Sequence, residues 1–156
     1  MSIAQGYIQE LQMSLKFFKN TISVFEEADS GYAAQPEMFT VAGQVAHAAG
    51  TVDWFVEGAF GKGWDMNFEA HLAETNAVMR ISDAKELLEN AFANVVAVFG
   101  GASDEDLCAP IPDKAIMEGA PRCAIASAIT DHTAHHRGAL SVYARLLGKQ
   151  PPMPYA

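Results

Sequence analysis

Apolar residues recur at intervals of three and four positions along most of this chain, and this spacing constrains the fold more than any other feature. Between residues 3 and 28 the recurrence starts at Ile8 and ends at Phe25. Steps of three and four return to one face of an α-helix, so this stretch predicts a first amphipathic helix. The turn residues at 29–31 are expected to end it.

Three further stretches share the helical spacing, and each is bounded by residues that suit a helix end. Ser, Thr and Asp side chains cap helix N-termini, proline fits a first turn, and glycine fits the position after a last turn. The expected starts are Thr40, Ser82 or Asp83, and Pro121, and the expected ends are Gly61 to Gly63, Gly100–Gly101 and Gly148.

The segments between these helices show no sustained period. Residues 61–81 predict an ordered connection with about one helical turn near 69–74, anchored by Trp64 and Phe68. Residues 109–119 predict an irregular crossing segment, because prolines and a glycine interrupt them. Four helices without a convincing strand indicate an all-α bundle that forms one domain over residues 1–156.

Composition narrows the class of partner. Half of the 156 residues are hydrophobic, which suits one compact core, and the formal charge of -9 disfavours nucleic acid and anionic membranes as partners. The sequence shows neither a secretory signal pattern nor a membrane-spanning run, so we expect a cytoplasmic protein. Cys108 and Cys123 are expected to be free, buried thiols.

The last helix carries the most informative motif. Its apolar stripe is interrupted by two histidines and reads Ile125, Ile129, His132, His136, Leu140, Tyr143 and Leu147. Residues four apart lie one turn apart on the same helical face, so both imidazoles can reach a single ion. Two imidazoles at core positions need partners, and a shared metal would satisfy both while keeping them neutral.

A third ligand is expected from a facing helix, and His47 is the best candidate. It lies mid-helix in the most apolar segment, where an unpartnered imidazole is costly to bury. The side chain of His47 projects away from the apolar stripe that includes Val45 and Phe55. In addition, a lone buried histidine is more often a hydrogen-bonded core residue than a ligand. A pair of His132 with His135 is a rival arrangement, whereas His71 falls in the connection and is expected to be exposed. Trp54 and Tyr143 could line a cavity at the site or simply pack the core.

A buried histidine in the second helix and the ending DHTAHHRGALSVYARLLGKQPP together resemble the DinB/YfiT-like family of metalloenzymes. The resemblance spans essentially the whole chain. It implies an up-down-down-up four-helix bundle, a homodimer, and a nickel or zinc ion on His47, His132 and His136. Many family members carry glutamine where this chain has Ala139.

Three histidines leave one coordination position open, as in catalytic zinc sites. Because relatives include thiol-dependent S-transferases, the resemblance favours transfer of a low-molecular-weight thiol to an electrophilic small-molecule substrate. A non-catalytic metal-binding or stress-response protein is an alternative, and so is a metal-dependent hydrolase. Hydrolysis would need a carboxylate beside the site, for which Asp131 and Glu57 are candidates, although Asp131 is expected to be solvated. The sequence identifies no general base.

Overall fold

The computed structural model describes residues 2–156 and is built almost entirely from helices. Four long helices make the body of the molecule: α1 (Ile3–Ile22), α2 (Val41–Phe60), α4 (Ile81–Gly101) and α6 (Ile125–Leu146). The shorter elements are α3 (Phe68–Ala77), α5 (Asp104–Cys108) and the 3-10 turns Glu27–Asp29, Met117–Gly119 and Arg122–Ala124. Apart from one isolated bridge between Pro110 and Pro121, residues 2–156 contain no β-structure.

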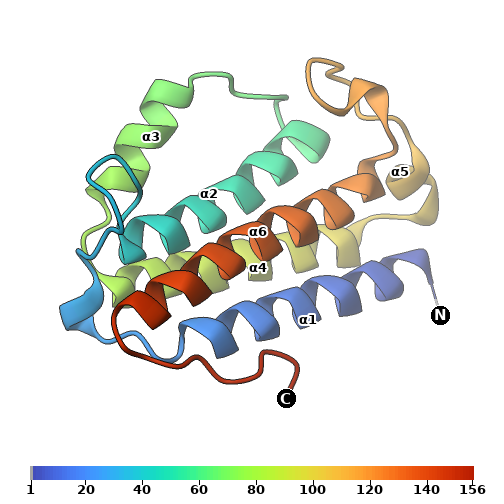
Figure 1. Ribbon diagram of the computed structural model, residues 1–156. Helices are drawn as coiled ribbons and strands as arrows, with labels where there is room; N and C mark the ends of the chain where they lie inside the picture. The colour runs from blue at the N-terminus through green and yellow to red at the C-terminus, as the bar shows by residue number, and fades with distance from the viewer. Residues whose placement is uncertain (1) are drawn as a thin grey trace.

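The order of directions is up-down-down-up, as expected. Figure 1 shows α1 and α6 running one way and α2 and α4 the other, so that α2 and α4 are parallel. A parallel pair cannot be joined by a tight turn, and the connection that carries α3 returns along the bundle to start α4 (Figure 1). Helix α2 contacts both α4 and α6, and α1 closes the other side against the same two helices.

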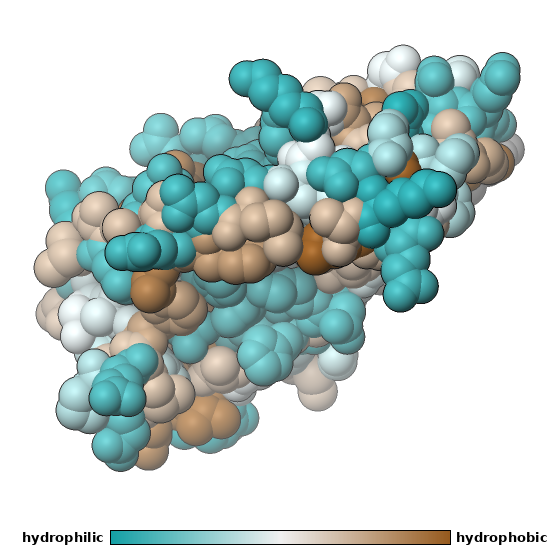
Figure 2. Space-filling view, turned by 90° about the horizontal axis from the view of Figure 1, so that it is seen from above, coloured by the Kyte–Doolittle hydropathy of each residue, from teal (hydrophilic) through white to brown (hydrophobic). Residues whose placement is uncertain are grey.

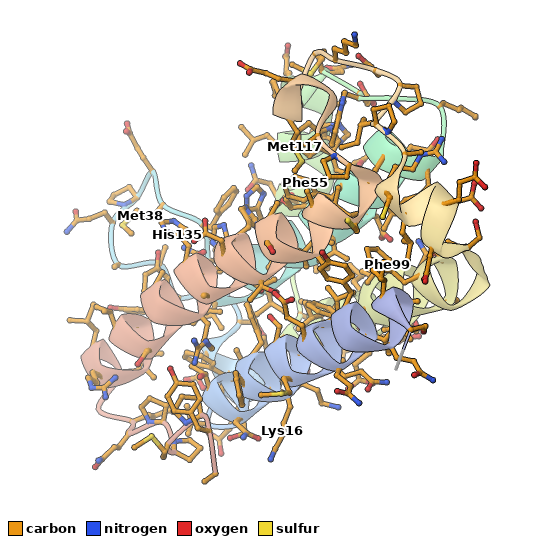
Figure 3. The ribbon with its side chains drawn as sticks, turned by 90° about the vertical axis from the view of Figure 1, so that its right-hand side faces the viewer. Lys16, Met38, Phe55, Phe99, Met117 and His135 are labelled. Carbon is orange, nitrogen blue, oxygen red and sulfur yellow. The ribbon has the colours of Figure 1, made fainter. Side chains whose placement is uncertain are left out.

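The core is filled from all four long helices. Phe18, Phe92, Phe99 and Tyr143 are among its largest fully buried side chains. Phe99 of α4 meets Tyr7 of α1 edge to face, with ring centroids 5.8 Å apart, and lies between these two helices in Figure 3. Burying side chains of this size provides most of the hydrophobic stabilisation of such a bundle.

The first helix is six residues shorter than predicted, because it ends at Ile22 rather than at residue 28. The hydroxyl of Ser23 donates to the carbonyl of Asn20 at 2.7 Å and supports the turn that ends the helix. Phe25, which extended the apolar period, is still buried, but it reaches the core from that turn. A residue can therefore keep its place in the core after the helical period has ended.

Helix α4 begins at Ile81, and neither Ser82 nor Asp83 caps it. Its first amide groups bond to a distant segment instead: the Ile81 amide donates to the Ser30 hydroxyl at 2.9 Å, and the Ser82 amide to the Glu27 carboxylate at 3.0 Å. The prediction was wrong because it considered only capping residues next to the helix.

The connection after α2 contains a helix of ten residues, Phe68–Ala77, and not a single turn. Asn67 caps this helix by accepting from the Ala70 amide, and only Thr75 within it is buried. A helix with one buried residue has no apolar stripe, which is why no period predicted it. Trp64 anchors the connection as expected, but Phe68 is 56% exposed.

Two other expectations concern burial. Cys123 is buried but Cys108 is exposed, and both are free thiols. Twelve of the twenty residues of α2 are buried within the chain, so its apolar faces need no second subunit, and the homodimer stays a prediction. No helix of residues 2–156 has the length and apolar character that a membrane span requires.

Candidate metal centre

Helices α2 and α6 bring the three predicted ligands together. His47, His132 and His136 each offer a ring nitrogen, and these nitrogens all lie within 4.8 Å of one another. His47 points away from the Val45 stripe, but α2 lies between α4 and α6 and therefore has more than one inward face. Figure 3 labels Phe55 of α2 and His135 of α6, the two helices that carry the three histidines.

Gln44 orients the most buried of the three imidazoles. Its side-chain oxygen lies 2.6 Å from Nδ1 of His136, and both residues are buried. Because an amide oxygen only accepts, Nδ1 of His136 must carry the proton and donate it. Nε2 of His136 then holds a lone pair directed at the other histidines, as metal-ligating histidines require. Sequence reasoning missed Gln44, although its place three residues before His47 in a buried helix was a usable signal.

The two histidines of α6 approach each other closely. Nε2 of His132 lies 3.1 Å from Nε2 of His136. In a tetrahedral zinc site with bonds of about 2.0–2.1 Å, neighbouring ligand atoms lie about 3.3 Å apart. The observed separation therefore suits two ligands of one ion.

Burial keeps these imidazoles neutral. It is the largest cause of the low pKa of His132, about 4, and of His136, about 3, and repulsion by neighbouring imidazoles adds to it. Burial also lowers the pKa of His47. Neutral imidazole is the form that binds metals, so the lone pairs are available at neutral pH.

His132 has one ring nitrogen without a hydrogen-bond partner within residues 2–156. This nitrogen, Nδ1, is buried. Buried polar atoms without partners are uncommon in native proteins. Nδ1 faces away from the Nε2 atom that approaches His136, so the ring's free lone pair toward the other histidines is on Nε2. The donor set and the neutral state of the rings fit a metal ion.

A cleft of about 810 Å³ gives access to the histidines. His47 and His132 line one part of it, and α2, α3 and α4 provide the rest of the walls. Trp54 lines this cleft and donates its indole N–H to the carbonyl of Asp65 at 2.7 Å. Tyr143 does not line it, because its hydroxyl donates to the Phe39 carbonyl at 3.0 Å within the core. The ring of Phe39 stacks on His47, with centroids 4.9 Å apart.

The remaining candidates lie outside the three-histidine group. His135 is exposed, and the rival pairing with His132 lacks a third ligand. His71 has a side chain 37% exposed and lies in the cleft near carboxylate oxygens of Asp65 and Glu74, at 3.5 and 3.9 Å.

Neither proposed carboxylate base contacts the histidines in the described residues. Asp131 is exposed, as expected, and its charge acts on His132 only as a minor influence that raises the pKa. Glu57 accepts a hydrogen bond from the Lys62 amide at 2.9 Å, at the end of α2.

Comparison with known families agrees with this geometry. The model of the DinB family matches residues 39–156, which include both helices that carry the histidines. The chain belongs to the DinB family. The expected family resemblance is thereby confirmed.

Among solved structures, this DinB-family chain is similar to YfiT from Bacillus subtilis, described as a probable metal-dependent hydrolase with an unusual four-helix bundle topology. The TM-score is 0.71 at 16% identity, covering 96% of this chain and 91% of that chain. At this identity the likeness shows the fold, which is the predicted four-helix bundle. No curated protein matches the chain.

Proposed function

We propose that this DinB-family protein is a metal-dependent enzyme. One divalent transition ion would be held by His47, His132 and His136, and a small molecule would bind in the adjoining cleft. The observation that supports this most directly is a group of three neutral imidazoles, two of which, His47 and His132, line an accessible cleft of about 810 Å³. A non-catalytic structural site needs no such access, so the cleft favours the enzyme over the alternative of a metal-stabilised bundle.

The chain's own residues prepare the site. Gln44 holds the His136 ring in one tautomer, Phe39 packs on the His47 ring, and burial keeps the imidazoles unprotonated. A bound nickel or zinc ion would supply Lewis acidity, which lowers the pKa of a coordinated water or thiol and polarises a carbonyl group. Imidazole ligands suit several transition metals, and nickel and zinc are our first candidates.

For the reaction we favour transfer of a low-molecular-weight thiol to an electrophilic small molecule. A sulfur–carbon bond would form, the leaving group would depart with the electrons of the bond that breaks, and the thiol proton would pass to solvent. The support is chemical: among the described contacts no carboxylate touches the three histidines. A thiol reacts as its thiolate, which would form at neutral pH beside a bound ion that lowers the thiol pKa, so this reaction needs no general base.

Metal-dependent hydrolysis is the second candidate. It is the activity named in the description of YfiT, and Asp131 is the carboxylate whose charge is felt at His132. Asp131→Asn separates the two reactions, because hydrolysis through this base would fall by about 10²–10⁴-fold, whereas thiol transfer would be little changed.

Elemental analysis of untagged protein tests the metal site. We expect about one divalent ion per wild-type chain and a large loss of metal in His132→Ala. His135→Ala is the matched control and should keep the wild-type metal content, because His135 is exposed on the same helix and lies outside the three-histidine group. Equal metal content in wild type and His132→Ala would refute the site. The metal-loaded protein is then incubated with several thiols and an alkylating electrophile, and the products are analysed by mass spectrometry. Absence of enzyme-dependent adducts with every thiol would refute thiol transfer.

A further inference from the structure

The cleft beside the histidines is lined by carboxylates and by no fixed cation. Among the described residues its lining includes four acidic side chains and neither lysine nor arginine. The acidic side chains are Asp53, Glu57, Asp65 and Glu74. In a concave site, charges of one sign reinforce one another and attract the opposite charge.

These carboxylates are not neutralised by basic side chains of the chain. The side-chain amide of Asn94 donates to Asp53 at 3.1 Å, and the backbone amide of Lys62 donates to Glu57 at 2.9 Å. Asp65 and Glu74 lie near His71 alone among titratable bases. The described ion pairs of lysine and arginine lie elsewhere, such as Lys19 with Glu89.

An apolar and aromatic wall stands beside these carboxylates. Trp54 packs against Phe68 with ring centroids 6.2 Å apart, and Phe68 and Leu87 are 56% and 44% exposed. Figure 2, which views the molecule from the side of α3, shows apolar atoms exposed among hydrophilic ones. Exposed aromatic faces attract cations, and apolar side chains left open at a cleft favour an apolar ligand.

We propose that the small molecule bound in this cleft is an organic cation: an aromatic or aliphatic body that carries an ammonium group. The carboxylates and the faces of Trp54 and Phe68 would receive the ammonium, while the reacting group would lie toward His47 and His132. This assignment rests on the proposed function in that the histidines mark the reacting end. It narrows the ligand to molecules whose end away from the histidines carries no carboxylate, because an anion there would meet the four acidic side chains. A carboxylate at the histidine end would instead meet the positive charge of the bound ion.

Three probes of similar shape test the charge class: 4-phenylbutylamine, 4-phenylbutanol and 4-phenylbutyrate. Their binding is measured at low salt, by the fluorescence of the two tryptophans and by isothermal titration calorimetry. Each titration is done on the protein as purified and again after chelation of any bound ion, because a carboxylate can also ligate an ion at the histidines. We expect the amine to bind at least about tenfold more tightly than the carboxylate, and this preference to shrink as salt is added.

The double variant Asp53→Asn/Asp65→Asn removes two charges while keeping side-chain size and acceptor oxygens. We expect amine binding to weaken by about three- to tenfold and alcohol binding to stay unchanged. Glu10→Gln on α1, outside the cleft, is the matched control and should bind the amine as wild type does. Thermal melting of each variant verifies that it folds.

The outcomes separate this inference from the proposed function. Equal or tighter binding of the carboxylate by the chelated protein, or no binding of any probe, would overturn the cationic assignment, whether or not the purified protein holds an ion. Conversely, a chain that prefers the amine but holds no ion would overturn the metal site and leave the charge class supported.

Discussion

The hydrogen bond between Gln44 and His136 provides a quantitative test of the centre. Gln44→Met keeps an unbranched side chain of similar length but removes the oxygen that accepts from Nδ1 at 2.6 Å. The buried N–H is then left without an acceptor, which costs about 1–3 kcal/mol. The ring can avoid this cost by moving its proton to Nε2, but that tautomer blocks the lone pair needed for the metal.

Both responses weaken metal binding. Loss of a partner behind a metal-ligating histidine reduces affinity by about 10–100-fold, equivalent to about 1.4–2.8 kcal/mol. This agrees with the cost of the unpaired donor. We therefore expect Gln44→Met to bind zinc 10–100-fold more weakly than wild type.

Competition with a chromophoric zinc chelator measures this affinity. Gln44→Glu, which restores an acceptor oxygen, should bind zinc more tightly than Gln44→Met, and Gln12→Met at an exposed position of α1 should match wild type. A Gln44→Met protein with zinc affinity within about twofold of wild type would refute the orienting role, given the magnitude expected for such a partner.

Four further predictions concern the pH dependence of zinc binding and of unfolding, the packing of α2, and a buried ion pair. The pKa values of His132 and His136 are about 4 and 3, so neither ring gains a proton between pH 7.5 and 5.5. Zinc affinity, measured by chelator competition, should therefore fall less than about tenfold over this range, whereas three solvated imidazoles with pKa near 6.5 would lose about a thousandfold. A thousandfold loss would contradict the buried neutral site. The same low values mean that the unfolded, metal-free chain takes up more protons below pH 6.5, so its unfolding free energy in urea should decrease as pH falls. Gly58→Ala places a Cβ 2.1 Å from the buried Trp64 ring and should lower the unfolding free energy by about 1–3 kcal/mol. Gly50→Ala, at an open position of the same helix, should raise the unfolding free energy by about 0.5–1 kcal/mol. Equal effects of the two variants in urea titrations would contradict this packing. Desolvation opposes ionisation of buried Asp29, but hydrogen bonds from Lys149 and the Glu26 amide outweigh it and lower its pKa. Lys149→Met should therefore cost about 1–3 kcal/mol at pH 7. This cost should diminish as pH falls below the ordinary Asp pKa of about 3.9 and the carboxyl becomes protonated, so a cost that does not vary with pH would refute the pairing.

Much of the bundle was predictable because helical period and capping act between neighbours in the sequence. Thr40 caps α2 by accepting from the Gly43 amide, and Gly148 has the positive φ of 74° expected just after α6. The pairing of His132 with His136 follows from the same local rule, since residues four apart always share a face. These features needed no knowledge of the tertiary structure.

The cap of α4 was not predictable in this way. Ser30 and Glu27, which receive its first amides, are separated from them by 51 and 55 residues. Helix α3 was equally hidden, because a helix exposed on nearly all sides leaves no apolar stripe to detect.

The sequence alone determined which imidazoles could share one helical face, because the backbone geometry of α6 decides that. Only the tertiary structure decided that His47 joins them, that Gln44 orients His136 across 92 residues of sequence, and that a cleft opens at the site. These depend on how α2 packs between α4 and α6 and on where α3 lies, and such packing arises from contacts between residues far apart in the chain.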